Sequence, residues 1–412
     1  MLIENKKKDK LEYEAALELL LAHTKRNANW QTVPLIEAFG RIAAKDIIAR
    51  MEQPPFDRSP LDGYALLSGD TAGACKEQPV SLAVVGKIFA GDGAEHVISS
   101  GQAYKIMTGA KIPQGADCVI RQEDVALDGD CVLIPIALKR QENICLSGED
   151  VPSGQVIISK GERVSSAHVG ILAAQGVVGV QVLDKPVIGL LSTGSELVDL
   201  GSDLGRGCIF DSNSYMLLAE LYSLGADVHR FSPQADDTCC LLKTVEELWE
   251  GCEAVITTGG VSVGEADLMP EVAKRLGGKL LFQSVNIRPG TPLLALERGG
   301  KLLLALSGNP FAAMATFALF AIPMVNKLSG LSFYDLARQK ACITHDYINK
   351  GKARRFVRAA VQGGNVSVPD GNHSPGALFR MLGCNCLIDI PAGVSMLNAG
   401  DMVDIIHGGV GA

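Results

Sequence analysis

The chain has 412 residues, of which 47% are hydrophobic and 20% are charged. This composition is typical of globular proteins, and at roughly 150 residues per domain the length corresponds to two to four domains. The net charge of −8 argues against a surface for nucleic acid or for an anionic membrane. An anionic ligand must therefore be bound by a local site.

The apolar segments and the cysteines predict a cytoplasmic protein without a membrane anchor. No apolar signal-peptide segment follows the lysine-rich first ten residues. The stretch 311–325 is interrupted by Pro323 and is shorter than the ~20 residues of a membrane span, so we interpret it as a buried helix. Asn309 would cap that helix and Pro310 would occupy its first position. The 11 cysteines show no zinc-ligand spacing, and we expect them to be reduced and mostly buried.

The first 185 residues predict helical segments on either side of a β-rich insertion. An amphipathic helix is predicted from the spacing of Tyr13, Ala16, Leu17, Leu20 and Leu21. Short β-rich runs, broken by Gly, Asp and Pro, then occur at 80–88, 118–121 and 131–136. A helical pattern returns at 167–175. We expect an inserted β-rich domain at 53–144, and a helical linker domain made of residues 1–52 and 145–185.

Strands and helices alternate from residue 186 to residue 330. The predicted strands are 187–191, 228–231, 253–257, 280–285 and 301–306. The predicted helices are 215–224, 238–249, 268–276 and 311–325. Such alternation predicts an α/β domain with a parallel sheet covered on both faces. The helices stop after residue 330, and the runs 341–348, 356–362, 387–390 and 402–406 predict a small β-domain at 331–412.

Three of the predicted strand ends are rich in glycine and hydroxyl side chains. Because ligands bind beyond the carboxyl ends of parallel strands, we expect these ends to converge on one crevice. Glycines let a large ligand lie against backbone N–H groups, and a following helix N-terminus favours an anionic ligand. The candidate binding residues in these loops are Thr193, Gly194, Gly259, Gly260, Ser262, Gly264, Ser307, Gly308 and Asn309.

The second of these loops also carries two acids, Glu265 and Asp267. Carboxylates would repel a bare phosphate, so their presence indicates a divalent cation between carboxylate and phosphate. The pattern predicts a metal-assisted phosphate site. The seven histidines form no nucleophile arrangement with a Cys or Ser, and no kinase-type P-loop is present.

Other acids have a structural alternative beside the functional one. Asp62 either belongs to a simple β-turn or is aimed at the rim of a site, and Asp150 is either in a solvated turn or in a site. Asp236 and Asp237 either cap the following helix or face the crevice. Glu196 lies in a strand-end loop, where an acid is more often functional.

Taken together, these segments resemble the molybdopterin molybdenumtransferase family, which includes MoeA and the gephyrin E domain. The matching segments, in chain order, are 40–47, 56–65, 106–110, 113–117, 148–150, 192–197, 211–213, 258–267, 289–292 and 307–310. Many separate matches in the family's order make the resemblance specific, and it covers nearly the whole chain.

The resemblance implies an elongated, cytoplasmic homodimer of multidomain chains. Its central domain would be of the molybdopterin-binding (MogA-like) α/β type, and its C-terminal domain would be similar to a β-barrel. The active site would lie between the α/β domain of one subunit and the region of Asp62 and Asp150 of the other. The implied reaction is a transfer in which molybdate and adenylylated molybdopterin yield molybdenum cofactor and AMP with the help of Mg²⁺.

The resemblance also implies roles for individual residues. The acids of the α/β crevice would be Glu196, Asp267 and one of Asp236 and Asp237. The implied metal ligands are Asp237, Glu265 and Asp267. Further binding positions are Thr108 and Gly290, and the oxyanion would be bound by Arg288, Ser307 and one of Arg354, Arg355 and Arg358.

Three departures from the family pattern remove or alter charges. The family's Lys-Pro-Gly-Lys-Pro reads here with Arg288 and Thr291 in place of the lysines, and Arg keeps the charge with a different donor geometry. The stretch 145–147, often Arg-rich, reads Cys-Leu-Ser. In the segment 56–63, Arg58 and Pro60 stand where the family commonly has Asn and Ala.

These departures leave open which oxyanion is used, since tungstate is an alternative to molybdate. They also leave two alternative functions, a non-catalytic pterin-binding scaffold and a molybdopterin adenylyltransferase. The adenylyltransferase and the apo-enzymes that accept the cofactor are the further partners that the family implies.

Overall fold

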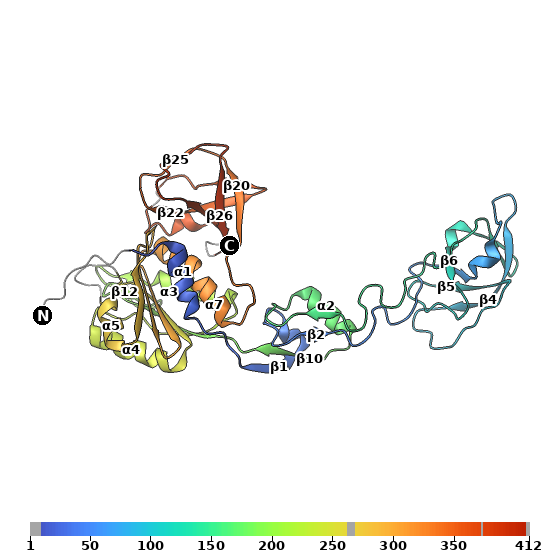
Figure 1. Cartoon of the computed structure of the whole chain (residues 1–412), viewed down its shortest axis with the longest axis horizontal. Coiled ribbons are helices and arrows are strands. Elements are labelled where there is room, and N and C mark those ends of the chain that lie inside the picture. Colours follow the sequence, from blue (N-terminus) through green and yellow to red (C-terminus); the bar gives the residue numbers. More distant parts are fainter. Residues whose placement is uncertain (1–9, 262–267, 372–373, 409–412) are drawn as a thin grey trace.

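The computed structural model describes residues 10–261, 268–371 and 374–408. The chain is elongated (Figure 1). An α/β domain and a β-domain made by the C-terminal residues lie at one end, and a second β-domain lies at the other. A thin middle part that contains β1 (Trp30–Pro34), α2 (Ser166–Ala174) and β10 (Gly179–Leu183) connects them.

The α/β domain is built on a six-stranded sheet. Its strand order is β14 (Asp227–Arg230), β11 (Val187–Ser192), β15 (Ala254–Thr258), β19 (Lys301–Leu306), β18 (Pro292–Arg298) and β16 (Lys279–Ser284). The first four strands are parallel, as expected from their alternation with helices. β18 is absent from the predicted strands, and it pairs antiparallel with both β19 and β16. It is joined to β19 by the tight turn Gly299-Gly300, so no helix separates the two strands.

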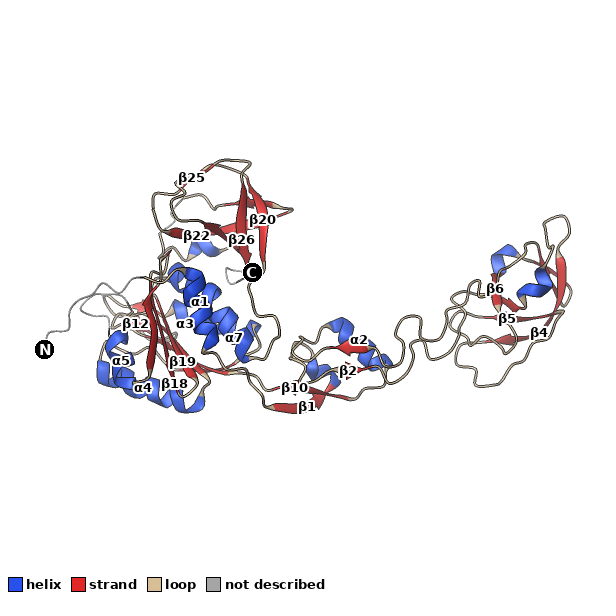
Figure 2. Cartoon of the chain, in the orientation of Figure 1, coloured by secondary structure: helices blue, strands red, loops and turns tan. Residues whose placement is uncertain are grey.

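Helices cover both faces of this sheet (Figure 2). The helices α4 (Thr238–Gly251) and α5 (Met269–Leu276) pack on one face, where Leu248 and Val272 share a core with Leu191 and Val255. The opposite face is covered by α1 (Tyr13–Ala22), α3 (Ser212–Ser223) and the segment 310–328. Residues of β11 alternate between the two cores, as the pleat of a strand requires.

The most apolar helical segment is buried between domains. Residues Pro310–Leu328 form α6 (Pro310–Thr316), a π-helical turn (Phe317–Ala321) and α7 (Ile322–Leu328). The segment is long and apolar enough to cross a membrane, but 89% of it is buried inside the protein. The predicted buried helix is therefore confirmed. Pro323 cannot donate a backbone hydrogen bond, and the π turn lies directly before it.

The C-terminal residues form a closed barrel, which confirms the barrel-like expectation. The strands β20 (Arg338–Ile343), β22 (Arg354–Gln362), β23 (Asn365–Ser367), β24 (Cys386–Ile390) and β26 (Met402–His407) close because β22 pairs with both β23 and β24. A sixth strand, β17 (Ile287–Arg288), belongs to the α/β domain and pairs with the start of β22. This pairing joins the barrel to the α/β domain.

The distal β-domain contains a six-stranded sheet of its own. Its strand order is β6 (Cys118–Arg121), β3 (Gly63–Leu66), β5 (Gln102–Ile106), β4 (Val80–Ile88), β8 (Cys131–Ile134) and β7 (Ala126–Asp128). The chain leaves and returns through the same middle part, because β1 pairs with β10, and β2 (Ile47–Ile48) pairs with β9 (Val156–Ile158).

All eleven cysteines lie in the described ranges and are free thiols. The expectation that most are buried is wrong, since only Cys118, Cys252, Cys384 and Cys386 are. Burial raises the pKa of the Cys118 thiol to about 12, which makes it unreactive.

An ion-pair cluster fixes the barrel against α1. Arg354 donates to both carboxylate oxygens of Asp389, at 2.7 and 2.6 Å, and to Glu14 of α1, at 2.6 and 2.7 Å. These hydrogen bonds raise the pKa of Arg354 above its ordinary value. Asp389 is only 6% exposed and also accepts from Arg338 at 2.9 Å.

Replacing Arg354 by Ala should lower the stability of the barrel by about 3 kcal/mol. This is the low end of the range for breaking a buried ion pair, because Arg338 still compensates part of the charge on Asp389. Urea unfolding of the full chain, followed by circular dichroism, measures the change. The matched control is Lys340→Ala, whose pair with Asp404 is exposed and should contribute no more than about 1 kcal/mol. Equal unfolding midpoints for the two variants would contradict the assignment.

Candidate functional site

A cavity of about 1020 Å³ opens at the carboxyl ends of the parallel strands. Within the described residues its wall comes from the ends of β11, β15 and β19, from the loop after β17, and from the barrel. The predicted site residues that line it are Thr193, Gly194, Glu196, Asp236, Gly259, Gly260, Arg288, Gly290, Ser307, Gly308 and Asn309, together with Arg355 and Arg358.

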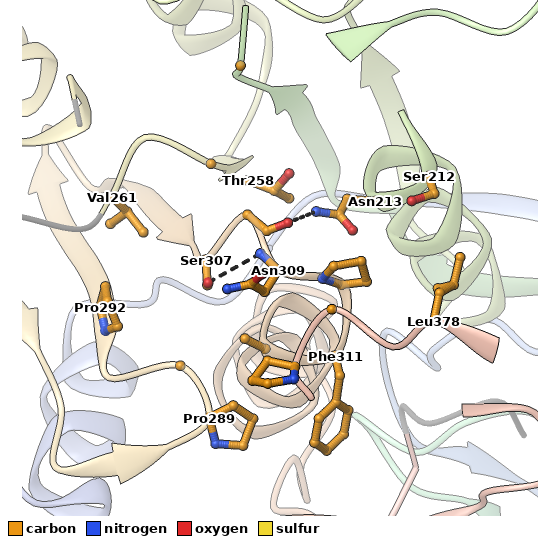
Figure 3. A pocket seen from close by; sticks show the side chains of 18 of the residues that line it. Ser212, Asn213, Thr258, Val261, Pro289, Pro292, Ser307, Asn309, Phe311 and Leu378 are labelled. Atoms are coloured by element: carbon orange, nitrogen blue, oxygen red, sulfur yellow. Dashed lines mark hydrogen bonds between the residues drawn. The ribbon is translucent and has the colours of Figure 1, made fainter. Parts of the chain in front are cut away.

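The three glycine-rich strand ends converge, as the sequence predicts. The backbone N–H of Thr193 donates to Thr258 O at 2.8 Å, and that of Gly259 donates to Leu306 O at 3.1 Å. Gly308 lies against Gly259, so that a Cβ atom at Gly308 would be 3.4 Å from the Gly259 Cα. These three loops together form the floor of the cavity, and Thr258, Ser307 and Asn309 from two of them are labelled in Figure 3.

Gly259 is required by this close approach. Its φ angle is +93°, and a Cβ atom there would lie 2.2 Å from the carbonyl oxygen of Thr193. Neither the backbone conformation nor the space suits any other residue. Any side chain at this position would push apart the ends of β11 and β15.

Two polar atoms beside this floor are buried without a hydrogen-bond partner in the described part of the chain. They are Thr193 Oγ1 and Asn213 Oδ1, and both residues line the cavity. The Asn213 amide donates through Nδ2 to Gly308 O at 2.8 Å, which fixes its orientation (Figure 3). Buried polar atoms are seldom left unsatisfied, so these two have bonding capacity for a bound molecule or water.

The neighbouring acids Asp236 and Asp237 have different positions. Asp236 lines the cavity and accepts from the Ser195 N–H at 3.2 Å and from its hydroxyl at 3.3 Å. Asp237 is the N-cap of α4 and accepts from Cys240 N–H at 2.7 Å, which lowers the pKa of its carboxyl group. Asp237 is therefore a helix cap, and Asp236 is the candidate functional acid at the cavity.

Glu196 and the adjoining flap close one side of the cavity. Glu196 is exposed, and its carboxylate lies over Gly194, where a Cβ atom would be 2.8 Å from Oε2. The short strands β12 (Leu197–Val198) and β13 (Ile209–Phe210) form the flap, and residues from both line the cavity. The apolar side chains of the flap offer a surface for a planar ring.

Arg230, which is not among the predicted site residues, anchors this flap. Arg230 donates to both carboxylate oxygens of Asp199, at 2.7 and 3.1 Å, and its guanidinium lies 4.2 Å from the Tyr215 ring centroid. The Arg230 bonds hold the pKa of Asp199 far below its ordinary value. No local motif signals this contact, because the three residues lie on different elements.

The predicted arginines separate into cavity residues and structural residues. Arg288 and Arg355 line the cavity. Arg358 lines it too, but it is buried, and its guanidinium lies 4.5 Å from the Phe311 ring centroid. Burial lowers the pKa of Arg358. Arg354 is not among the lining residues, since its guanidinium is bound in the ion-pair cluster with Asp389.

Asp62, Thr108 and Asp150 lie away from the cavity of their own chain. Asp62 and Thr108 belong to the distal β-domain, where Asp62 Oδ1 accepts from the Thr108 N–H at 2.7 Å and from its hydroxyl at 2.8 Å. These bonds lower the pKa of Asp62. Asp150 is exposed at the junction of this domain with the middle part, where its N–H donates to Gln53 O at 3.1 Å. The long axis of the chain separates this region from the α/β domain (Figure 1).

The predicted loop residues Ser262, Gly264, Glu265 and Asp267 lie outside the described residues. Among the residues that are described, no three His, Cys, Asp or Glu side chains gather in a way that could hold a metal ion. Of the three predicted metal ligands, only Asp237 is described, and it caps α4.

Three family profiles match consecutive parts of the chain. They are the MoeA N-terminal region (domain I and II) at residues 11–176, a probable molybdopterin binding domain at 189–327 and the MoeA C-terminal region (domain IV) at 340–407. A molybdopterin molybdenumtransferase from Staphylococcus aureus is 36% identical over 378 residues, which cover 91% of this chain and 90% of the relative. This chain belongs to the molybdopterin molybdenumtransferase family.

Further relatives agree with this membership over the full length. The molybdopterin molybdenumtransferase of Staphylococcus epidermidis is 35% identical over 397 residues, 95% of this chain and 94% of the relative. The crystal structure of the molybdopterin biosynthesis moeA protein from Pyrococcus horikoshii OT3 is 31% identical, with a TM-score of 0.86 that covers 97% of this chain and 100% of that chain. The family fold therefore extends through both β-domains.

Replacing Asp237 by Ala should lower the unfolding midpoint at neutral pH more than replacing Asp236 by Ala does, because only Asp237 caps a helix. The folded-state pKa of Asp237 is lowered, so its contribution is present above about pH 4 and is lost as the pH falls through the folded-state pKa. Thermal unfolding from pH 7 to pH 3 measures this loss. A larger fall of the midpoint for Asp236→Ala would contradict the cap assignment.

Proposed function

We propose that this chain inserts molybdenum from molybdate into adenylylated molybdopterin and releases AMP. The observation that carries the proposal is the convergence of three glycine-rich strand ends with acids and arginines at one large cavity. The volume of about 1020 Å³ suits a pterin nucleotide better than a small metabolite. Family membership supports the same activity, since the curated relatives are named for it.

The residues of the cavity suit a ligand that is part planar and part anionic. Backbone groups of Gly259 and Gly308 can approach a pyrophosphate closely because they carry no side chain. Arg288 and Arg355 also line the cavity and supply positive charge, with which they would bind the oxyanion and the charge that develops on phosphate. Ser307 lines the cavity too and can donate through its hydroxyl.

We propose that Mg²⁺ takes part, held by Asp236 and Glu196 together with the acids of the loop 262–267. Both described carboxylates line the cavity, and carboxylate oxygens are the ligands that this hard cation prefers. When bound, Mg²⁺ would neutralise charge on the phosphoanhydride. Asp237 is not part of this set, because its carboxylate caps α4.

We propose that the protein works as a homodimer in which the partner supplies Asp62 and Asp150. A two-fold axis would bring the distal domain of one chain to the cavity of the other. Four large apolar side chains of the middle part are exposed and could be buried in such an interface. They are Trp30, Ile36, Phe39 and Val178, which are 55%, 73%, 60% and 88% exposed.

The cytosol is the compartment that fits eleven free thiols. There the adenylyltransferase would supply the substrate, and apo-enzymes would receive the cofactor. We propose that tungstate can replace molybdate as the substrate anion, since the two anions have the same charge and shape.

One observation favours a second candidate function, a pterin-binding scaffold without turnover. Thr291, which stands where the family has a lysine, donates through Oγ1 to Ile287 O at 2.5 Å. Its side chain therefore stabilises the turn and brings no charge to the cavity. A scaffold would bind molybdopterin tightly and release no AMP.

Release of AMP from adenylylated molybdopterin, with molybdate and Mg²⁺ present, tests the proposal. The parent chain should release AMP, and Asp236→Asn should lower kcat by about 100-fold, the scale of losing one electrostatic contact in an active site. The control Asp237→Asn keeps a good N-cap residue and should retain the parent rate. Pterin binding without AMP release by the parent chain would select the scaffold.

Mixing of subunits tests whether two chains share the site. Asp62→Asn and Asp236→Asn should each have strongly reduced activity as homodimers, whereas heterodimers contain one cavity with both residues intact. Random exchange of equal amounts should then restore roughly one quarter of the parent sites. The control is a chain that carries both substitutions, mixed with either single variant, which should restore nothing. No recovery from the two single variants after proven exchange would refute the shared site.

A further inference from the structure

A second recess, of about 560 Å³, lies beside the main cavity at the junction of the α/β domain and the barrel. Its lining residues are Asn286, Arg288, Lys350, Gly351, Lys352 and Ala353. Three of these six carry a positive charge, and no acid is among them. Such a recess is unusual in a chain whose net charge is −8.

The pairing of β17 with β22 creates this recess. Ile287 pairs with Arg354 and Arg288 pairs with Arg355, so the loop before β22 lies against the segment that contains Arg288. Residues of the two domains thus come together although they are more than sixty positions apart in the sequence.

Hydrogen bonds hold the lysine loop in place. Asn349 is buried and donates through Nδ2 to Val394 O at 2.7 Å, and its Oδ1 accepts from the Gly351 N–H at 3.3 Å. The carbonyl oxygen of Lys352 accepts from the Gly393 N–H at 3.1 Å. The backbone that carries Lys350 and Lys352 is therefore fixed, while both lysine side chains are exposed.

The three cations of the recess have no anionic partner within the described residues. Arg288, Lys350 and Lys352 take part in no ion pair there, whereas Arg230 and Arg354 are bound to aspartates. Asn286 donates to Glu12 Oε1 at 2.7 Å, but Glu12 is not among the lining residues. Gathered like charges repel one another, and a bound anion would offset this repulsion.

Arg288 connects the recess with the main cavity. It lines both, and its strand partner Arg355 lines the cavity. On the cavity side, the neutral Thr291 adds no charge, and its hydroxyl donates to Ile287 O. The lysines of the recess thus supply cations next to Arg288 that the loop itself does not.

We propose that this recess is a binding subsite for a tetrahedral dianion, held by Lys350, Lys352 and Arg288 next to the main cavity. Lysine offers three donors on a flexible stem, and arginine adds a planar fork, so together they can surround a tetrahedral group of oxygens. Because the lysines are exposed, binding weakens as salt screens their charge. The identity of the anion as molybdate or tungstate rests on the proposed function, whereas anion binding does not.

Equilibrium dialysis of the full chain against molybdate, tungstate, phosphate and sulfate, at low ionic strength and without pterin, tests the subsite. The parent should bind at least one of these anions saturably. The double variant Lys350→Ala/Lys352→Ala should bind it at least about tenfold more weakly, and Lys352→Arg alone should keep most of the affinity. The order of affinities distinguishes molybdate or tungstate from free phosphate as the occupant.

The matched control is Lys243→Ala/Lys274→Ala, which removes two lysines that are 81% and 78% exposed on α4 and α5. This control changes the net charge equally and should bind as the parent does. Absence of saturable binding by the parent would overturn the proposal. Equal weakening in both double variants would also overturn it, because only the overall charge would then matter.

Steady-state AMP release separates the subsite from the proposed function. If both are right, Lys350→Ala/Lys352→Ala raises the KM for molybdate at least about tenfold, and the control leaves it unchanged. A lower kcat with an unchanged KM would overturn the subsite. If the parent releases no AMP but lysine-dependent anion binding is measured, the proposed function fails and the subsite stands.

Discussion

The close approach of three backbone segments at the carboxyl ends of β11, β15 and β19 is the constraint on which the rest of the site depends. A Cβ atom at Gly259 would lie 2.2 Å from Thr193 O, and Gly308 lies against Gly259 from the other side. Since Gly194, Gly259 and Gly308 carry no side chains, backbone groups of all three strand ends are open to the cavity. The backbone of the three strand ends therefore defines where a ligand lies, and the acids, arginines and apolar side chains of the cavity surround that position.

The position of the barrel is the second requirement of the site, because the barrel supplies one wall of the cavity. Besides the chain connection itself, two non-covalent contacts attach the barrel to the α/β domain. The pairing of β17 with β22 fixes the direction of the barrel, and the contact of Arg354 with Glu14 ties it to α1. Inside this junction Arg358 lies over Phe311, so an arginine of the barrel contacts the helix that follows β19. A charged side chain is tolerated there because its donors meet backbone carbonyls, such as Ala377 O at 3.0 Å.

Local sequence patterns predict the strands of the parallel core and the glycine-rich ends, because strand periodicity and glycine content are properties of neighbouring residues. They do not separate Asp236 from Asp237, since the choice between helix cap and cavity depends on where the backbone turns. They also do not separate Arg354 from Arg355, because what distinguishes Arg354 is its contact with Glu14 and Asp389, which are distant in the sequence. Residues brought together from distant parts of the chain, such as Arg230 with Asp199 or Lys350 with Arg288, have no local signal at all.

The surroundings of Arg288 illustrate how positive charge can gather from elements that are far apart in the sequence. A dianion responds to the number and distance of cations around it, and it does not matter which element carries them. In this chain Thr291 stabilises the turn through its bond to Ile287 O, and Arg288 is the cation that remains on the loop. The fixed loop of the barrel places Lys350 and Lys352 in the same recess as Arg288. The positive charge beside Arg288 thus comes from another domain, and the sequence of the loop alone does not reveal it.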